Sequence, residues 1–200
     1  MNERLLDGVR YAGTDAIRER LIEAGDAVLE EHGTLAGRMG AVARRAGVSR
    51  ATAYRHLGSI GELSIQVGLR RARKYVTGMQ EAMDRTCGAL TKIEAAMIYA
   101  ARELPEEPVV LELVSRPGAP VDPEVRALID EIMTPVLIEG RRNGDIRTDI
   151  SLRAVIDHLT EHSYLATHAT DRSADAVRQR VRDFVTPALR PPPQSSWRPR

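Results

Sequence analysis

The sequence contains a single cysteine, Cys87, among its 200 residues. One thiol cannot form an intrachain disulfide, which favours a reducing compartment such as the cytoplasm. No apolar run approaches the roughly 20 residues that a membrane-spanning helix needs. The first residues also lack the apolar core of a secretory signal. These absences predict a soluble, cytoplasmic protein.

Aromatic residues and lysines are scarce as well. Five tyrosines, one phenylalanine and one tryptophan argue mildly against a pocket built for stacked planar ligands. Lys74 and Lys92 are the two lysines, so arginine carries nearly all of the positive charge. Because the net charge is only +1, the chain as a whole is not a polyanion-binding protein, and any basic surface must be local.

What the sequence does contain is helical periodicity, and hydrophobic residues make up 42% of it. No stretch alternates with period two for long enough to predict a strand, so the fold class is all-α. We expect a three-helix unit over residues 1–60, a helical regulatory and dimerisation domain over 61–190, and a disordered tail over 191–200. A long amphipathic helix, capped by Ser59, connects the first two domains.

Several helix ends follow from capping signals. Thr14 is expected to cap a first helix over 15–32 after a loose N-terminal arm, and Asp149 to cap one over 150–170. Ser173 should cap the last helix, 174–189, with Phe184 on its buried face. Gly and Pro predict a loop over 116–120, and Pro135 should kink the helix that contains it.

The segment Arg38–Leu57 predicts a helix-turn-helix. Four apolar residues fall on one face of its first helix: Met39, Val42, Ala43 and Ala46. Gly47 can adopt the positive φ of a helix C-terminus, and Ser49 can cap the second helix, which runs to His56. A second helix with a polar outer face is typical of one that enters a DNA major groove.

The charge pattern of this segment agrees with DNA binding. No carboxylate occurs between Glu31 and Glu62, whereas five arginines do: Arg38, Arg44, Arg45, Arg50 and Arg55. Such a segment suits a phosphate backbone, because each neutralised phosphate releases counterions. The simpler alternative is a solvated helical hairpin in an arginine-rich protein. The alternative is weaker, because the Gly-Val-Ser turn and the polar outer face occur together.

The pattern Met39-x-x-Val-Ala-x-x-Ala-Gly-Val-Ser-x-x-Thr-x-Tyr-x-His-Leu57, followed by a long helix, resembles the TetR (tetracycline-repressor-like) transcriptional regulators. The resemblance covers about residues 14–66, and Gly144–Asp149 resembles the turn before the family's dimerisation helices. It implies a homodimer on a palindromic operator, with a recognition helix in each major groove and a small-molecule pocket in the C-terminal domain.

The resemblance also implies which residues face DNA. They are Ser49, Arg50, Ala51, Thr52, Tyr54, Arg55 and His56, and from its long side chain we expect Arg38 to contact a phosphate as well. Arg50 can donate two hydrogen bonds to guanine, and Thr52, Tyr54 and His56 suit phosphate or base edges. The sequence departs from the family where Gly37 and Arg38 replace a frequent pair of threonines. Ile60 and Gly61 replace a common lysine and its acidic neighbour.

His158-Leu-Thr-Glu-His162 fits H-x-x-E-H, a pattern in which two histidines bind zinc and the glutamate is a base. The two histidines share a helix face, but a third ligand is not evident. We expect them at an interface or in a pocket, with a metal- or pH-sensitive site as an alternative. No metal, cofactor or enzymatic activity is predicted.

The effector pocket is predicted from helix positions alone. Six candidates to line it are Met97, Tyr99, Met133, Leu137, His162 and Tyr164. The leading hypothesis is a cytoplasmic, dimeric transcriptional regulator, a repressor that a small-molecule effector releases from a palindromic operator. An effector-independent DNA-binding dimer that recruits other proteins is the alternative, and a zinc hydrolase built on His158, Glu161 and His162 is the third.

Overall fold

The computed structural model describes residues 3–114 and 123–192, and every regular element in these ranges is helical. The predicted all-α fold class is therefore confirmed. The chain divides into two compact units, Met1–Arg71 and Ala72–Arg200, and the division falls inside the long helix α4, Ile60–Asp84. The boundary that the sequence places at residue 60 stays a prediction.

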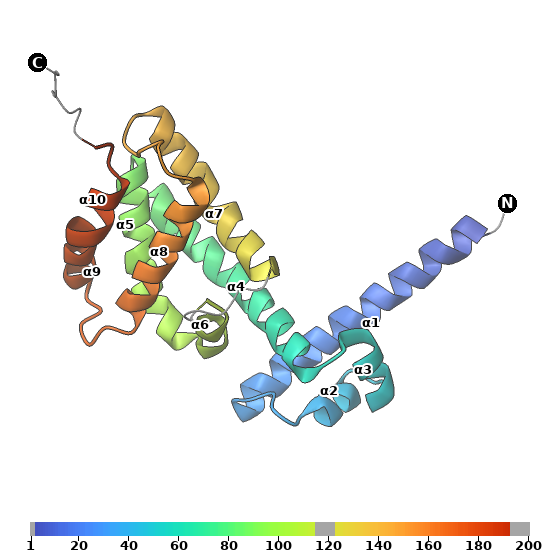
Figure 1. The fold of residues 1–200 in the computed structure, drawn as a ribbon. Coiled ribbons are helices and arrows are strands. Elements are labelled where there is room, and N and C mark those ends of the chain that lie inside the picture. The colour runs from blue at the N-terminus through green and yellow to red at the C-terminus, as the bar shows by residue number, and fades with distance from the viewer. Residues whose placement is uncertain (1–2, 115–122, 193–200) are drawn as a thin grey trace, which may run out of the picture. The chain divides into compact units, whose positions relative to one another are not determined.

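The first helix, α1, runs from Glu3 to His32 (Figure 1). The prediction that Thr14 caps a helix after a loose arm is therefore wrong, because Thr14 lies inside α1. Residues 3–13 contain no proline, and five of these eleven residues are Leu, Glu or Arg, which have high helix propensity. Gly33, at φ +69°, ends the helix as expected.

Two short helices complete the N-terminal unit with α1 and the first half of α4. They are α2, Met39–Arg45, and α3, Arg50–Leu57, and both pack on α1 (Figure 1). Leu21, Val42 and Leu63 are fully buried in this core. A Cβ atom on Gly25 would lie 2.9 Å from Leu63 Cδ1, so α1 and α4 approach each other closely there.

The C-terminal unit is built around α5, Ala89–Glu103, which packs against α7, α8 and α9. The elements after α5 are η1, Leu104–Glu106; α6, Pro108–Val114; α7, Pro123–Arg142; α8, Leu152–Thr167; α9, Ala174–Arg180; η2, Val181–Val185; and α10, Thr186–Leu189. The predicted loop over 116–120 and residues 193–200 of the predicted tail lie outside the described residues.

Ser151, not Asp149, caps α8, and the backbone N–H of Ala154 donates to its Oγ at 3.1 Å. Asp149 instead accepts two hydrogen bonds from the Arg147 guanidinium, at 2.7 and 2.5 Å. The guanidinium holds the pKa of Asp149 at about 2. The arginine two residues upstream thus engages the carboxylate, while a serine two residues downstream caps the helix.

The last helix is not uniform, because η2 is a π-helical turn between α9 and α10. Val177, Val181, Val185 and Leu189 are all buried and recur every four residues. A straight α-helix of 3.6 residues per turn would rotate such a stripe away from the core, and the wider π turn corrects this drift. Phe184 is 56% exposed, so its predicted burial is wrong.

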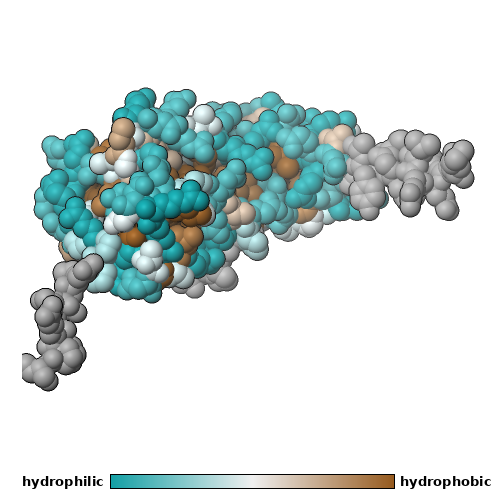
Figure 2. All heavy atoms as spheres, turned by 90° about the horizontal axis from the view of Figure 1, so that it is seen from above, coloured by the Kyte–Doolittle hydropathy of each residue, from teal (hydrophilic) through white to brown (hydrophobic). Residues whose placement is uncertain are grey.

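Among the described residues, none of the helices is both long enough and apolar enough to cross a lipid bilayer. The face shown in Figure 2 is mostly hydrophilic, and hydrophobic residues reach it in small patches.

Candidate nucleic-acid interface

The turn between α2 and α3 is built as its sequence predicts. Gly47 has φ +69°, in the left-handed region that glycine adopts without steric cost. Ser49 caps α3, since the backbone N–H of Thr52 donates to its Oγ at 3.0 Å. The two hydroxyl groups of Ser49 and Thr52 lie 2.9 Å apart and form a second hydrogen bond. The first turn of α3 is thereby fixed to the residue that precedes it.

The helix α3 has one buried face and one exposed face. Ala53 and Leu57 are buried against the unit, as their spacing predicts. The residues on the outer face are Ser49, Arg50, Ala51, Tyr54 and Arg55, with Thr52 and His56 half-buried beside them. Tyr54 is 39% exposed, a large fraction for an aromatic side chain. The structure thus brings Ser49 and the six predicted residues of α3 to one accessible surface.

The exposed side chains of α3 contact one another. The Arg50 guanidinium lies over the Tyr54 ring, with its central carbon 5.6 Å from the ring centroid. Its Nη2 also lies 3.5 Å from the Tyr54 hydroxyl. One turn further on, Arg55 donates to Thr52 Oγ1 at 3.5 Å. These weak, solvent-exposed contacts restrict the rotamers of two arginines without neutralising either charge.

Arg38 lies at the other end of the motif, where it is the N-terminal flanking residue of α2. Its side chain makes no capping hydrogen bond, and its Nε is shielded from solvent without a partner. A residue at this position contributes its backbone carbonyl to the helix, and Val42 N donates to it at 3.1 Å. Arg38 is therefore the flanking residue of α2, the first helix of the motif.

The arginines of α4 have different roles from those of α3. Arg70 pairs with Glu19 at 2.5 Å and Glu23 at 3.3 Å, and Arg71 with Asp26 at 2.6 Å and Glu30 at 2.7 Å. These carboxylates all lie on α1, so the two arginines fasten α4 to α1. Arg73 and Lys74 are exposed. Within the segment without carboxylates, 32–61, Arg44, Arg50 and Arg55 are exposed, and Arg45 pairs with Glu31 at 2.5 Å.

The six predicted effector-contacting residues are not brought to one place. Met97, Met133 and Leu137 belong to the main apolar core of the C-terminal unit. Tyr164 packs on His168, with 4.2 Å between ring centroids, and His162 packs near Phe184. Tyr99 lies instead against Tyr75, at 5.1 Å between centroids. Their assignment as pocket residues therefore stays a prediction.

Tyr75 was not singled out by the sequence analysis, yet its environment is unusual. It packs against a second apolar cluster, formed by Ala72, Ala100, Leu104 and Val110. Its hydroxyl is shielded from solvent and has no hydrogen-bond partner. Burial and the nearby Tyr99 and Glu103 raise the pKa of Tyr75. The sequence signal was slight, namely a tyrosine at i+3 from Ala72 on the apolar face of α4.

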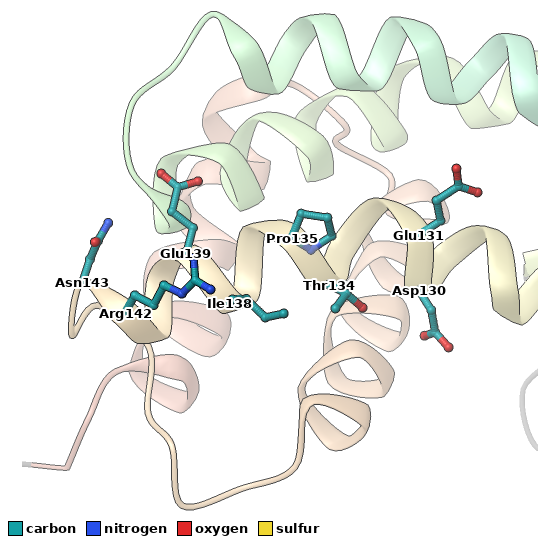
Figure 3. Close-up of a pocket in the computed structure, with 8 residues that line it drawn as sticks. All are labelled: Asp130, Glu131, Thr134, Pro135, Ile138, Glu139, Arg142 and Asn143. Atoms are coloured by element: carbon teal, nitrogen blue, oxygen red, sulfur yellow. The ribbon is translucent and has the colours of Figure 1, made fainter.

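A shallow depression of about 820 Å³ runs along α7 (Figure 3). Its lining residues are Asp130, Glu131, Thr134, Pro135, Ile138, Glu139, Arg142 and Asn143. All come from α7 except Asn143, which directly follows it, so the depression is an open groove and does not enclose a ligand. Small-molecule sites bury most of the ligand surface, and we do not assign this groove to an effector.

His158 and His162 lie one turn apart on α8, with 4.5 Å between ring centroids. Burial lowers the pKa of His162, and His158 and Arg180 lower it further, while Glu161 opposes them. The described residues contain no cluster of three or more His, Cys, Asp or Glu side chains that could hold a metal ion. A single chain therefore offers a pair of imidazoles and not a complete metal site.

Known proteins resemble both the sequence and the fold. Residues 21–67 match the family model described as bacterial regulatory proteins, tetR family. This segment contains α2, the turn, α3 and part of each flanking helix. No curated protein matches the sequence. The family match thus covers the candidate interface and leaves the C-terminal unit to structural comparison.

Three solved structures share the fold over most of the chain. RolR in complex with resorcinol has a TM-score of 0.71 at 15% identity, covering 89% of this chain and 92% of its own. FadR from Thermus thermophilus in complex with lauroyl-CoA has a TM-score of 0.63 at 17% identity, covering 88% of this chain and 97% of its own. FadR from Bacillus subtilis in complex with stearoyl-CoA has a TM-score of 0.59 at 14% identity, covering 84% of this chain and 97% of its own. At these identities the likeness is one of fold.

Proposed function

The chain belongs to the TetR family of bacterial regulatory proteins, and from this premise we propose that it is a dimeric, cytoplasmic repressor. In this proposal it binds a palindromic operator and leaves it when a small-molecule effector binds the C-terminal unit. The observation that carries the proposal is the outer face of α3. That face is accessible, free of carboxylates and ordered by its own contacts.

The proposed roles of the α3 residues follow from their chemistry. Arg50 extends from the first turn of the helix and can donate two parallel hydrogen bonds to guanine O6 and N7. The Tyr54 ring and the methyl group of Ala51 suit thymine methyl groups. Ser49, Thr52, Arg55 and His56 suit phosphates at the groove edges, and Arg38 would reach a phosphate near α2.

The proposed dimer uses the exposed apolar side chains of the last helices. Leu165 on α8 is 47% exposed, and Phe184 on η2 is 56% exposed. A two-fold interface buries the same patch on both copies, so one exposed patch per chain suffices. Two recognition helices in successive major grooves would then be about 34 Å apart.

The proposed effector site lies at Tyr75. A hydroxyl without a partner, shielded from water within an apolar cluster, is favourable for one polar group of a mainly apolar ligand. Tyr75 lies on α4, whose N-terminal residues belong to the DNA-binding unit. An effector shifts the operator equilibrium only through its different affinities for the two states, and α4 is the element that extends into both units.

The first experiment selects bound fragments from a random DNA pool with the full-length chain. A palindrome of two half-sites about one helical turn apart is expected, together with an affinity that falls steeply with salt. Non-palindromic or sequence-independent binding would contradict the proposal. An enriched palindrome that no effector releases would favour the alternative of an effector-independent dimer that recruits other proteins.

The second experiment tests Tyr75. Resorcinol and lauroyl-CoA, which the similar proteins RolR and FadR bind, serve as first probes in operator-release assays. Tyr75→Phe keeps the ring and removes the hydroxyl, so it should weaken any active probe roughly tenfold, as a lost buried hydrogen bond does. Thr77→Val, which removes a hydroxyl from an exposed site on the same helix, is the matched control. Equal release from both variants would exclude Tyr75 from the effector site.

A further inference from the structure

Tyr75 of α4 and Tyr99 of α5 form an aromatic pair within the C-terminal unit. Their ring centroids are 5.1 Å apart, and the ring planes are tilted by 54°. Gly78, three residues after Tyr75, leaves room for the Tyr99 hydroxyl, because a Cβ atom at this glycine would overlap it. Both tyrosines are half-buried. The backbone of α4 thus supports the pair on one side.

The surroundings of Tyr75 are apolar apart from its own hydroxyl. This hydroxyl is shielded from solvent and has no hydrogen-bond partner in the part of the chain that the structure describes. The apolar cluster of Ala72, Ala100, Leu104 and Val110 packs against the ring. Apolar walls with a few polar groups are typical of sites for small organic molecules.

Carboxylates dominate the charge around the aromatic pair. Burial raises the pKa of Tyr99, Glu103 raises it further, and Arg102 opposes this effect, while Glu81 adds to it. Burial, Tyr99 and Glu103 raise the pKa of Tyr75. Both phenols are therefore neutral at physiological pH. Two carboxylates act on Tyr99 against one guanidinium, and such surroundings attract a cation and repel an anion.

The side chain of Arg102 already places a cation at the pair. Its guanidinium carbon lies 5.9 Å from the centroid of the Tyr99 ring, and its Nε donates to Glu103 Oε1 at 2.5 Å. A cation over an aromatic face is also how proteins recognise organic ammonium ions. The Arg102 side chain is 68% exposed. Exposed ion pairs contribute little free energy, so a ligand can displace this one.

We propose that Tyr75, Tyr99 and Glu103 bind an organic ammonium ion with an apolar group, which displaces the Arg102 guanidinium. The inference rests on the proposed effector site at Tyr75 and names the class of ligand that this site takes. The positive group would lie over the Tyr99 ring beside Glu103. The apolar group would lie against the cluster that packs on Tyr75.

Three octyl compounds with different head groups test the ligand class. Octyltrimethylammonium, 1-octanol and octanoate are each titrated into the full-length chain by calorimetry, below their micellar concentrations. We expect the ammonium ion to bind at least about tenfold more tightly than octanol, because a desolvated cation over an aromatic ring is strongly stabilised. Octanoate should bind most weakly. Equal or tighter binding of octanol or octanoate would overturn the ligand class.

Substitutions at the pair should change the affinity for octyltrimethylammonium in opposite directions. Tyr99→Leu and Glu103→Gln should each lower it at least about fivefold, because each removes a group that contacts the cation. Arg102→Gln should raise it by about fivefold, because it removes the competing cation of the chain. Since Arg102 is exposed, this gain does not depend on a variant of the packed interior.

Two charge controls accompany these variants. Arg142→Gln on α7 and Glu161→Gln on α8 remove the same charges from exposed sites and should leave the affinity within about twofold, because solvent screens distant charges. Unchanged or weaker binding by Arg102→Gln would overturn the displacement. An equal gain in Arg142→Gln would reduce it to a general charge effect and overturn it as well.

NMR of the wild-type protein locates the ligand without any variant. The methyl protons of octyltrimethylammonium should show contacts to the ring protons of Tyr75 and Tyr99. Contacts to Tyr164 instead would overturn the location.

Operator release separates this inference from the proposed effector site. If octanol or octanoate releases the operator and Tyr75→Phe weakens that release, the effector site stands and the ammonium class is overturned. If the ammonium ion binds with the expected variant pattern but releases no operator, the cation site stands and its effector role is overturned. If none of the three compounds binds, the inference is overturned, and operator selection still tests the repressor.

Discussion

Arg18 of α1 donates a hydrogen bond from Nη1 to the backbone carbonyl oxygen of His56, at 3.1 Å. This carbonyl lies in the last turn of α3, where helix carbonyls lack partners within the helix and carry partial negative charge. Arg18 also pairs with Glu62, 3.4 Å away at the start of α4. One side chain of the supporting helix thus holds the end of the recognition helix and the beginning of the next.

This relationship predicts a positioning role for Arg18. Arg18→Ala should lower operator affinity roughly tenfold, because a hydrogen bond between a charged donor and a carbonyl contributes about 1.5 kcal/mol. Fluorescence anisotropy with the selected operator measures the effect. Arg20→Ala removes the same charge from an exposed site on α1 and should leave the affinity within about twofold. Equal losses in the two variants would indicate a general charge effect.

Arg50 and Tyr54 should carry base recognition. Arg50→Ala should cost about 1–3 kcal/mol of operator binding and relax the preference at one base position. Tyr54→Ala should weaken binding too, because it removes the ring beneath the Arg50 guanidinium as well as its own contact. Arg73→Ala, with the same charge loss on α4, is the control. The Arg50→Ala and Tyr54→Ala proteins should retain the oligomeric state of the wild type in light scattering. Normal operator binding by these two variants would contradict the assignment.

Gly140 should tolerate no side chain. A Cβ atom there would lie 2.6 Å from Ala89 Cβ and 2.6 Å from Ile146 Cδ1, in the core where α5 meets α7. Gly140→Ala should therefore destabilise the fold by about 1–3 kcal/mol, as overpacking does. Gly61→Ala, near the exposed start of α4, should be neutral or stabilise by up to about 1 kcal/mol. Urea denaturation of both variants measures the change in the free energy of unfolding. A Gly140→Ala protein as stable as the wild type would refute the packing argument.

Asp149 should titrate at unusually low pH. Its pKa is lowered to about 2 from 3.8, chiefly by the hydrogen bonds from Arg147. A lowered folded-state pKa stabilises the fold at pH above the unfolded value, and this contribution is lost as the pH falls through about 2. NMR titration of the carboxyl carbon should give that value and a higher one in Arg147→Gln. The pKa of Asp171, lowered by Ser173, should not change.

The N-terminal unit was the part most open to prediction from sequence. Its turn depends on local chemistry, since Gly47 permits a positive φ and Ser49 supplies a cap, and both features lie within a few residues. The buried positions Ala53 and Leu57 follow from helical spacing alone. The turn, the cap and the buried positions all depend on residues close together in the sequence, so the sequence alone predicts them.

Features that depend on residues distant in the sequence were harder to predict. The ion pairs of Arg70 and Arg71 join residues more than 40 positions apart, and nothing near either arginine distinguishes it from a solvated one. The unpartnered hydroxyl of Tyr75 depends on its packing against residues of α5 and α6. Phe184 fits an apolar helical face in sequence, and only the change of helix type at η2 turns it outward.

The π turn at η2 also bears on how this helix can change in length. A π turn contains one residue more than the α turn it replaces. Removing a single residue between Val181 and Val185 would let the segment run as an uninterrupted α-helix while Val185 and Leu189 remain inside. A one-residue deletion within a packed helix usually destabilises the core strongly, but the core should tolerate one here. The deletion should instead change the position of the Phe184 ring and its contacts in the assembled protein.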